Sequence, residues 1–521
     1  MRSHYVCAVP PRDPTVSRRL LLLGAAGAGG AAVLARLPGR SAAAQVQVLP
    51  AVLEAEPRTE PAVLAGAEPD KATSVHELGI SGGRVLDPET GFDDEAQVGI
   101  DGGTITAIGK DGLEGRSTID AAGLVVAPGF IDLLSYEPNP YGVWFKVADG
   151  VTTTMGMHGL NDEAGPFFER WGNDPPPVNY GGAFDHPFAR SQLGLGVSEA
   201  ASRGQIRELR AQAERGLAEG WAGIDVEPEY TPGATTEELT AMGAAAAAGG
   251  VTLYAHGRYS DDTPPGTNAE TLAELLGIAR ATGTPLHVEH ITSTGGTFTM
   301  AASLRTLERA RASGMDVTAC MYPYDFWATY LGSTRFADGW QERFRISYDD
   351  LLVPGTGERL TESSFERERR RNTLVAAMAI PEANVVAGLQ SPFVLIGSDA
   401  VLEEGDNNHP RGAGCFCRVL GRYVRERKVL SLRDALAKMT IFPAQRLAVG
   451  ASAFTRKGRL QVGADADVTV FDPDTVADRA TIDDPSRQSV GVQWVLVGGQ
   501  AVKTPDGLQR DVRPGQPIRR G

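Results

Sequence analysis

Three histidines and one aspartate occupy equivalent places in the sequence, each directly after a short apolar run that is typical of a β-strand. They are His158, His256, His290 and Asp399, and the chain has only eight histidines in all. Three neutral imidazoles around an open fourth position form a typical catalytic zinc site, where the metal lowers the pKa of a bound water to about 7. A carboxylate beside that site can take the proton of the water and return it to a leaving nitrogen.

The segment that carries these residues, 128–450, alternates apolar runs with helical patterns, as chains of βα units do. Capping boxes at Thr235 and Thr267 predict two of the helix starts. About 320 residues of alternation fit a (β/α)8 barrel with insertions, and a doubly wound open sheet is the competing layout. Since the C-terminal ends of the strands of a parallel barrel meet at one mouth, this α/β fold would bring the four residues together.

Short β-type runs broken by Gly and Asp lie on both sides of the barrel segment, at residues 76–127 and 451–510. Because both segments have this pattern of short β-type runs, we expect them to pair into one small β-sandwich domain. Residues 45–75 are rich in Ala, Pro and Glu without periodicity, which predicts a flexible leader. Residues 511–521 are predicted to be a tail.

The first 44 residues have the pattern of an export signal. Arg18 and Arg19 precede an apolar run at 20–35, and three alanines at 42–44 offer a cleavage site. The apolar run is shorter than the roughly 20 residues that a membrane span needs, and the arginine pair resembles a twin-arginine signal. We therefore expect an extracellular, periplasmic or cell-envelope protein with no stable membrane span after removal of the signal. The alternative is a loose N-terminal anchor.

Composition excludes several classes of protein. The chain of 521 residues has 50 Lys+Arg against 65 Asp+Glu, a net charge of −15, and an acidic protein repels the phosphates of nucleic acids. No nucleic-acid partner is therefore expected. The hydrophobic share of 42% and the charged share of 22% are those of a globular protein. The four cysteines do not indicate a disulfide framework.

Several strings resemble one enzyme superfamily. Residues 128–132 (PGFID) and 150–153 (GVTT) resemble the first-strand and second-strand motifs of the amidohydrolase superfamily. Strings similar to its N-acyl-D-amino-acid deacylase (D-aminoacylase) family are 216–235, 254–258 (YAHGR), 322–324 (YPY), 397–399 (GSD), 409–411 (HPR), 438–440 (KMT) and 463–467 (GADAD). The resemblance extends from about residue 78 to residue 500.

The resemblance implies a metal-dependent barrel enzyme that hydrolyses the acyl amide of N-acyl-D-amino acids. Its small-molecule partner would be an N-acyl amino acid or a related amide. The resemblance places His256 and His290 among the metal ligands and makes Asp399 the catalytic aspartate. His158 stands where the deacylases have a metal-binding Cys, and a His in that place keeps a ligand that suits zinc.

The sequence departs from the family pattern at the first strand. The family has His-x-His directly after the Asp of the first-strand motif, whereas this sequence has Leu134 and Tyr136 at those two positions. Neither Leu nor neutral Tyr is a good zinc ligand. We therefore expect one zinc ion per chain, held by His158, His256 and His290, and no second, more solvent-facing metal.

Five residues are candidates for binding the substrate, and each also has a structural interpretation. Arg258 could pair with a substrate carboxylate through its bidentate fork, or form a salt bridge at the barrel rim. Arg411 could be a second carboxylate clamp or could hold its own loop. Tyr322 or Tyr324 could donate to a carboxylate or to a developing oxyanion, or could pack around the proline between them. Tyr230 resembles a pocket residue of the family, with packing as its alternative.

Two other features are predicted to lie outside the site. Residues 334–372 form an insertion whose charge run at 366–371 is typical of a solvated helix face, with a lid over the barrel mouth as the alternative. His287 lies three residues before His290, and the period of two along a strand predicts that it faces the helix layer.

The sequence thus predicts a metal-dependent amidohydrolase that hydrolyses a linear amide, the acyl amide of N-acyl-D-amino acids, with Asp399 acting first as base and then as acid. Two alternatives stay open at this point. One is another hydrolase of the superfamily, acting on a cyclic amide or an ester. The other is a binding homologue that lost its chemistry together with the first-strand histidines.

Overall fold

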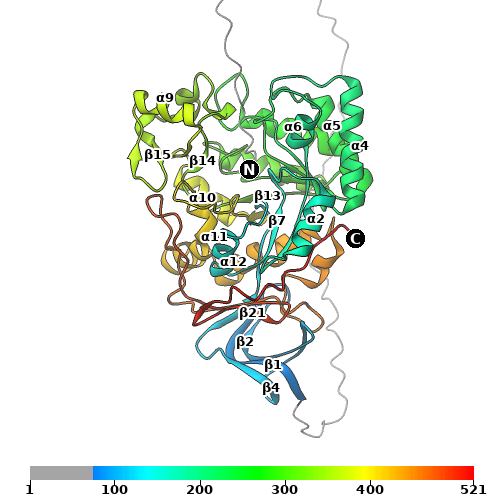
Figure 1. Ribbon diagram of the computed structural model, residues 1–521, viewed down its shortest axis with the longest axis vertical. Coiled ribbons are helices and arrows are strands. Elements are labelled where there is room, and N and C mark those ends of the chain that lie inside the picture. Colours follow the sequence, from blue (N-terminus) through cyan, green and yellow to red (C-terminus); the bar gives the residue numbers. More distant parts are fainter. Residues whose placement is uncertain (1–73) are drawn as a thin grey trace, which may run out of the picture. The chain divides into compact units, whose positions relative to one another are not determined.

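The computed structural model describes residues 74–521, and these form one unit (Figure 1). The predicted signal at 1–44 and nearly all of the predicted leader at 45–75 lie outside the described residues. Within the described part, no helix is both long enough and apolar enough to cross a membrane.

The centre of the described chain is a set of parallel strands in two hydrogen-bonded ladders. One ladder has β6 (Phe130–Asp132), β7 (Val151–Gly156) and β8 (Asn179–Gly182). The other has, in spatial order, β9 (Phe184–Asp185), β10 (Gly223–Val226), β11 (Thr252–Ala255), β12 (Leu286–Val288), β13 (Val317–Met321) and β18 (Val394–Ile396). The spatial order follows the sequence without the reversal of a doubly wound sheet, so that alternative is wrong.

Two short contacts connect the ladders. Only Ala183 separates β8 from β9, and its N–H donates to Gly156 O at 3.0 Å, so the two strands are halves of one barrel strand. Just beyond β18 and β6, Asp399 N–H donates to Leu134 O at 2.7 Å, although the strands themselves have no ladder between them in the described chain. The predicted (β/α)8 barrel fold is confirmed, with the ladder interrupted at this seam.

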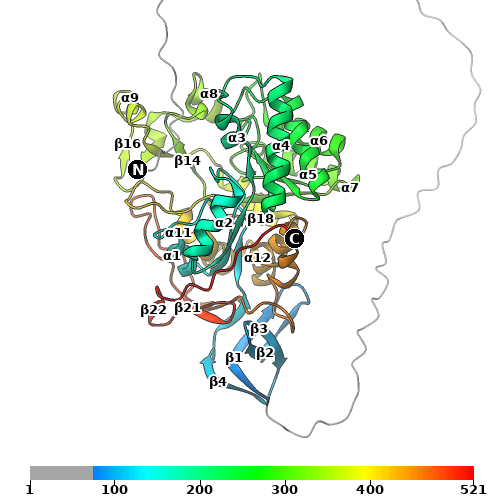
Figure 2. The same cartoon turned by 45° about the vertical axis from the view of Figure 1, so that its right-hand side comes forward.

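Helices follow the barrel strands and cover their outer face, most visibly α4, α5 and α6 in Figure 2. The helices that connect barrel strands, or follow the last of them, are α1 (Val143–Ala148), α2 (Ala164–Asn173), α3 (His186–Gln192), α4 (Arg203–Glu219), α5 (Thr236–Gly249), α6 (Asn268–Thr282), α7 (Met300–Ala312), α10 (Glu382–Gln390), α11 (Arg411–Arg418), α12 (Leu432–Met439) and α13 (Ile441–Leu447). Their apolar faces and the outward side chains of the strands share one large core.

Both predicted helix starts occur. Thr267 caps α6 with a complete capping box, because Glu270 also bonds back to the cap residue. Thr235 caps α5 by accepting from Glu238 N–H, but the Glu238 side chain does not return to the cap. The Glu238 carboxylate bonds instead to His186 and Arg190. Both side chains are buried and need a hydrogen-bond partner within the protein, whereas the exposed helix end can bond to water.

The interior of the barrel holds a separate apolar cluster that includes Tyr254. The ring centroid of His287 lies 5.3 Å from that of Tyr254, and its Nδ1 lies 2.7 Å from Thr318 Oγ1. The neighbours of His287 in β12 face the helices, so the prediction that His287 meets the helix layer is wrong. The physical reason is that His290, from which the period was counted, has a φ of +21° and is not part of the extended strand.

The two ends of the chain build one β-domain, as predicted, and hydrogen bonds join its strands into a single sheet. Its strands are β1 (Ser74–Asp87), β2 (Phe92–Asp101), β3 (Thr104–Gly109), β4 (Leu113–Asp120), β5 (Val125–Pro128), β19 (Val468–Phe471), β20 (Val492–Val497), β21 (Gln500–Thr504) and β22 (Gly507–Leu508). β5 pairs antiparallel with β19, which joins the N-terminal strands to the C-terminal ones. β1 pairs with β4 before Gly82 and with β5 after Gly83, so the sheet bends there over its own apolar core.

The insertion between β13 and β18 has its own small sheet, made of β14 (Trp327–Tyr330), β15 (Leu351–Val353), β16 (Glu358–Arg359) and β17 (Leu374–Ala377). It also has the short helices η1 (Thr334–Phe336), α8 (Trp340–Phe344) and η2 (Tyr348–Asp350), and the longer α9 (Glu362–Arg371). Most of the charge run on α9 is exposed, in agreement with the prediction of a solvated helix face. The η1 segment touches the barrel instead: Thr334 Oγ1 donates to Glu229 O at 2.6 Å.

The predicted tail at 511–521 runs along the barrel. Tyr180 N–H donates to Gln516 O at 3.1 Å, and Ile518 N–H donates to Tyr180 O at 2.7 Å. The chain end therefore adds a short bridge beside β8.

Candidate metal centre and active site

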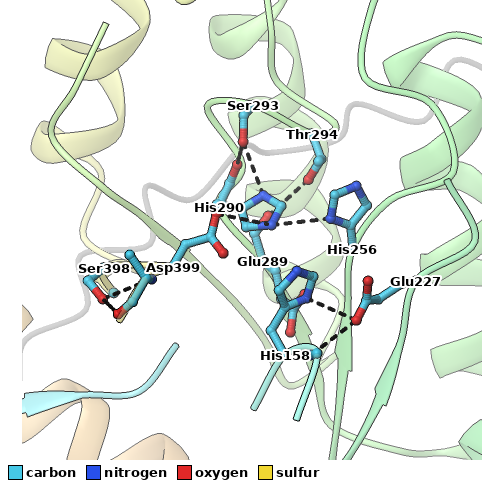
Figure 3. A network of polar contacts seen from close by, with 12 residues as sticks. His158, Glu227, His256, Glu289, His290, Ser293, Thr294, Ser398 and Asp399 are labelled. Atoms are coloured by element: carbon cyan, nitrogen blue, oxygen red, sulfur yellow. Dashed lines mark hydrogen bonds and ion pairs between the residues drawn. The ribbon is translucent and has the colours of Figure 1, made fainter. Parts of the chain in front are cut away.

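The three predicted histidines converge in the structure, each from the C-terminal end of its own barrel strand (Figure 3). His158 follows β7, His256 follows β11 and His290 follows β12. His256 Nδ1 lies 3.2 Å from His290 Nε2, and the ring centroid of His158 lies 5.5 Å and 5.4 Å from those of the other two. All three side chains are buried.

In both His256 and His290, the ring nitrogen that points away from the other histidine contacts a polar side chain. On the far side of its ring, His256 Nε2 lies 2.9 Å from Glu229 Oε2. On the far side of the other ring, His290 Nδ1 lies 3.1 Å from Ser293 Oγ. Metal-binding histidines typically hold their second nitrogen in such a bond, which fixes the tautomer and the ring orientation. The arrangement leaves His256 Nδ1 and His290 Nε2 free to share an ion.

Glu289 is a fourth ligand candidate that the sequence analysis did not identify. Its Oε2 lies 2.9 Å from His158 Nδ1, and one ligand atom from each of His158, His256, Glu289 and His290 lies within 4.8 Å of the others. Neither carboxylate oxygen of Glu289 has an aligned hydrogen bond among the described residues, although the side chain is completely buried. Three imidazoles and one carboxylate fit a zinc ion by their chemistry.

Asp399 lies beside this centre, on the loop directly after β18. Its Oδ2 is 3.0 Å from Arg411 Nη1 and 3.8 Å from His290 Nε2, and its Oδ1 accepts a hydrogen bond from the Tyr136 hydroxyl at 3.2 Å. Burial acts to raise the pKa of Asp399, but the positive charges of Arg411 and the nearby histidines outweigh it and hold the pKa below its usual value. Asp399 is therefore an ionised proton acceptor at neutral pH.

The two residues that replace the family's first-strand histidines are not ligands. Leu134 is part of the apolar cluster inside the barrel. The Tyr136 ring packs edge-on against His158, at 5.6 Å between centroids, and burial raises the pKa of its hydroxyl well above the usual value. Tyr136 thus stays a protonated donor that holds one oxygen of Asp399.

Three of the five predicted substrate residues lie at the site. The guanidinium of Arg411, which pairs with Asp399, stacks 4.4 Å from the ring centroid of Tyr322. The Tyr322 hydroxyl is buried and has no hydrogen-bond partner in the described part of the chain. The Tyr230 ring lies 4.6 Å from the His256 ring.

The other two predicted substrate residues are engaged elsewhere. Arg258 donates to both carboxylate oxygens of Glu274, at 2.8 and 2.9 Å, which is the rim salt bridge given above as its alternative. The Tyr324 hydroxyl donates to Pro410 O at 3.4 Å, and its ring lies 4.5 Å from the guanidinium of Arg418. The structure therefore does not bring Arg258 or Tyr324 to the histidines, because each has a satisfied polar partner of its own.

A buried arginine of the insertion, Arg335, also reaches the site. Its Nη2 donates to Ser293 O at 2.8 Å, and its Nε lies 3.7 Å from Glu229 Oε2 without an aligned hydrogen bond. The guanidinium stacks 4.2 Å from the ring centroid of Trp327. Spacing in the sequence gives no sign of this contact, because Arg335 reaches the barrel only through the folding of the insertion.

Three acidic residues on and after β10 form a further group that was missed. All three are buried and lie beside the histidines: Asp225 and Glu227 near His158, and Glu229 next to His256. Burial and nearby carboxylates raise the pKa of Asp225 well above its usual value. Burial acts to lower the pKa of His158, but Glu227 and Glu289 outweigh it and raise that pKa to about 10. These carboxylates therefore favour positive charge at His158.

Known amidohydrolases match this chain in sequence. The model of the amidohydrolase family matches residues 229–503. The N-acyl-D-glutamate deacylase of Alcaligenes xylosoxydans xylosoxydans is 33% identical over 473 residues, which cover 82% of this chain and 93% of that protein.

Solved structures match the fold as well. An N-acyl-D-glutamate deacylase from Bordetella bronchiseptica, complexed with zinc and a phosphonate mimic of the tetrahedral intermediate, has a TM-score of 0.74 and 29% identity, over 86% of this chain and 100% of that one. A D-aminoacylase, studied for the role of its binuclear metal centre, has a TM-score of 0.73 and 26% identity, over 85% and 100% of the two chains.

The fold and the site together define a metal-dependent hydrolase of amide bonds. This chain belongs to the amidohydrolase family, and its relatives there include the N-acyl-D-amino-acid deacylases. The predicted family and the predicted class of enzyme are confirmed.

The Glu229 carboxylate gives the first prediction. Changing Glu229→Gln removes the charge behind His256 Nε2, so we expect the zinc affinity to fall by about 10–100-fold, as is typical of such outer partners. The affinity is measured by competition with a chromophoric chelator. The matched control is Glu274→Gln, which weakens the contacts of Glu274 with Arg258 and Thr236 at the rim and is expected to leave the affinity unchanged. Equal affinities in both variants would contradict the assignment of His256 as a ligand.

Proposed function

We propose that this protein hydrolyses the acyl amide of N-acyl-D-amino acids at a zinc ion held by His158, His256 and His290, with Glu289 beside them. The convergence of the three imidazoles next to an ionised Asp399 is the observation that carries this proposal. The two relatives described above as N-acyl-D-glutamate deacylases support the substrate class.

Zinc bound at these residues would supply Lewis acidity, which polarises a carbonyl oxygen and makes a water more acidic. Asp399 accepts one proton from that water as the water oxygen bonds to the carbonyl carbon. Asp399 then gives the proton to the amide nitrogen, the carbon–nitrogen bond breaks, and a carboxylic acid and a free amino acid are released. Arg411 keeps Asp399 ionised for the first step, and Tyr136 holds its other oxygen in place.

Arg335 is our candidate for binding the carboxylate of the substrate. Arg411 is paired with Asp399 at 3.0 Å and Arg258 with Glu274 at 2.8 Å, whereas Arg335 has a looser ion pair with Glu229 at 3.7 Å and, among the described residues, one aligned hydrogen bond, to a backbone carbonyl. A planar guanidinium beside the reacting centre suits a carboxylate in a bidentate pair. Tyr322, with its unpartnered hydroxyl, would be the second donor on this side.

Asp399 gives the second prediction. Changing Asp399→Asn leaves the shape of the side chain but removes its ability to take a proton. We expect kcat to fall by about 10²–10⁴-fold with the metal content unchanged, as measured by steady-state kinetics and elemental analysis. An Asp399→Asn variant with full activity would rule out the proposed acid–base role. Loss of the metal together with the activity would make Asp399 a ligand instead.

The third prediction concerns the substrate. In a panel of N-acyl-D-amino acids, N-acyl-L-amino acids, cyclic amides and esters, we expect turnover of the D-configured linear amides. In the Arg335→Met variant the KM for these substrates should rise by roughly 10–100-fold, since a charged hydrogen bond is lost. Arg258→Met is the matched control and should keep the wild-type KM. Turnover of the cyclic amides alone would favour the other hydrolase class.

We also propose that the protein is exported by its N-terminal twin-arginine-type signal and works outside the cytoplasm, free or attached to the envelope. The pair Arg18-Arg19, the short apolar run and the three alanines support this proposal. The fourth prediction is that Arg18→Lys/Arg19→Lys retains the uncleaved chain in the cytoplasm of a bacterium with twin-arginine transport. Cell fractionation and the mass of the mature chain would measure it. Export of the variant at the wild-type level would refute the proposal.

A further inference from the structure

On the side of His158 that faces Glu289, two more carboxylates gather. His158 Nδ1 lies 2.9 Å from Glu289 Oε2, 3.5 Å from Glu227 Oε1 and 4.0 Å from Asp225 Oδ2 (Figure 3 shows the first two acids). One ligand atom from each of His158, Asp225 and Glu227 lies within 4.8 Å of the other two. This carboxylate site is separate from the space between His256 and His290.

Strand β10 and the turn after β7 build the carboxylate site. Asp225 belongs to β10 and Glu227 follows it by two residues, so both side chains point into the barrel. Gly159 N–H donates to Asp225 Oδ2 at 3.2 Å and to Glu227 Oε1 at 3.1 Å, which fixes one oxygen of each acid beside His158. The fold thus holds the carboxylates together although their charges repel each other.

The charge at this place is not balanced by the protein. Asp225, Glu227 and Glu289 are at most 6% exposed, and no Lys or Arg forms an ion pair with any of them among residues 74–521. The other buried acids of the barrel mouth do have such partners, since Asp399 pairs with Arg411 and Glu229 lies near two arginines. His158 pairs with these acids but can carry only one positive charge, and it carries none when it binds a metal through a neutral ring, so a further positive charge is missing here.

Unused lone pairs are a second, independent sign of a ligand. Asp225 Oδ1 and both oxygens of Glu289 are buried and have no hydrogen-bond partner in the described part of the chain. His158 Nδ1, although close to Glu289, has no aligned hydrogen bond either. Buried polar atoms in proteins nearly always find partners, so the unpartnered atoms here are a sign of a bound ligand that accepts their lone pairs.

We propose that a second divalent cation binds between His158, Asp225 and Glu227, with Glu289 positioned between this ion and the one at His256 and His290. His158 would then give one ring nitrogen to each ion, and its N–H proton would be released to solvent when both ions are bound. Two or three carboxylates with a single imidazole form a harder ligand set than three imidazoles do, so the site suits an ion such as Mn²⁺ better than the histidine centre does. The inference rests on the proposed function for the position of the first ion. It revises the expectation of one ion per chain, because this pair of carboxylates lies on β10 and not on the first strand.

The fifth prediction tests this site with Mn²⁺ as the probe. Protein loaded with one equivalent of Zn²⁺ is titrated with Mn²⁺ and followed by calorimetry, electron paramagnetic resonance and elemental analysis. We expect one further ion per chain in the wild type. Asp225→Asn/Glu227→Gln should keep the zinc and lose the further ion, with the Mn²⁺ affinity reduced at least tenfold. Asp261→Asn, which changes a buried acid that belongs to neither ligand group, is the matched control and should bind both ions.

The outcomes separate this inference from the proposed function. His256→Ala should lose the zinc and still bind Mn²⁺, because His256 is not a member of the ligand group of His158, Asp225 and Glu227. Equal Mn²⁺ binding by the wild type and the double variant, or none by either, would overturn the second site and leave the histidine centre standing. Absence of zinc from the wild type would instead refute the proposed function.

If the double variant folds poorly, the site can be tested by measuring the melting temperature of a single variant with and without Mn²⁺. The single variant Asp225→Asn removes one of the repelling charges, so the metal-free protein should not lose stability. Added Mn²⁺ should raise the melting temperature of the wild type by more than that of this variant. An equal rise in both proteins would overturn the site.

Discussion

The need to balance buried charge governs the mouth of this barrel. The parallel strands bring histidines, acids and arginines from distant parts of the sequence into a space with almost no solvent. An ion buried there is stable only with a partner of opposite charge, and most of the groups have one. Arg411 balances Asp399, and Lys146 lies 2.6 Å from Asp132 just beneath it. The acids around His158 have only that imidazole as a cationic partner among the described residues, and this shortage of positive charge is what the proposed second cation would remove.

The sequence predicted the barrel, the β-domain and the meeting of the histidines, because each of these follows from local patterns. Alternating strands and helices predict a parallel sheet, either a barrel or a doubly wound sheet, and a barrel places every strand end at one mouth. His158, His256, His290 and Asp399 could therefore be assigned to one place without knowledge of the packing. The alternation of side chains between the two faces of a strand was a less reliable guide at the end of β12. His290 has left the extended conformation, which put His287 on the wrong face in the prediction.

The rest of the site depends on contacts that no spacing reveals. Arg258 stands two residues after a ligand candidate, yet its guanidinium finds Glu274 on the neighbouring helix. Arg335 belongs to the insertion at 334–372. Its guanidinium stacks on Trp327 and reaches Ser293, which lies close to His290. The acids of β10 did leave a signal: Asp225, Glu227 and Glu229 alternate directly at the end of an apolar strand. Acids at the C-terminal end of a buried barrel strand lie at the barrel mouth, so this pattern could have predicted carboxylates there.

The replacement of two first-strand histidines changes the site without removing it. Leu134 fills the apolar interior, while Tyr136 turns its hydroxyl to Asp399 and its ring to His158. The Tyr136 side chain therefore supports Asp399 through a hydrogen bond. Asp225 and Glu227 lie 4.0 and 3.5 Å from the same imidazole. The barrel mouth therefore offers possible metal ligands although the first strand has none at the two histidine positions. The missing His-x-His motif alone is weak evidence that the protein has lost metal-dependent hydrolysis.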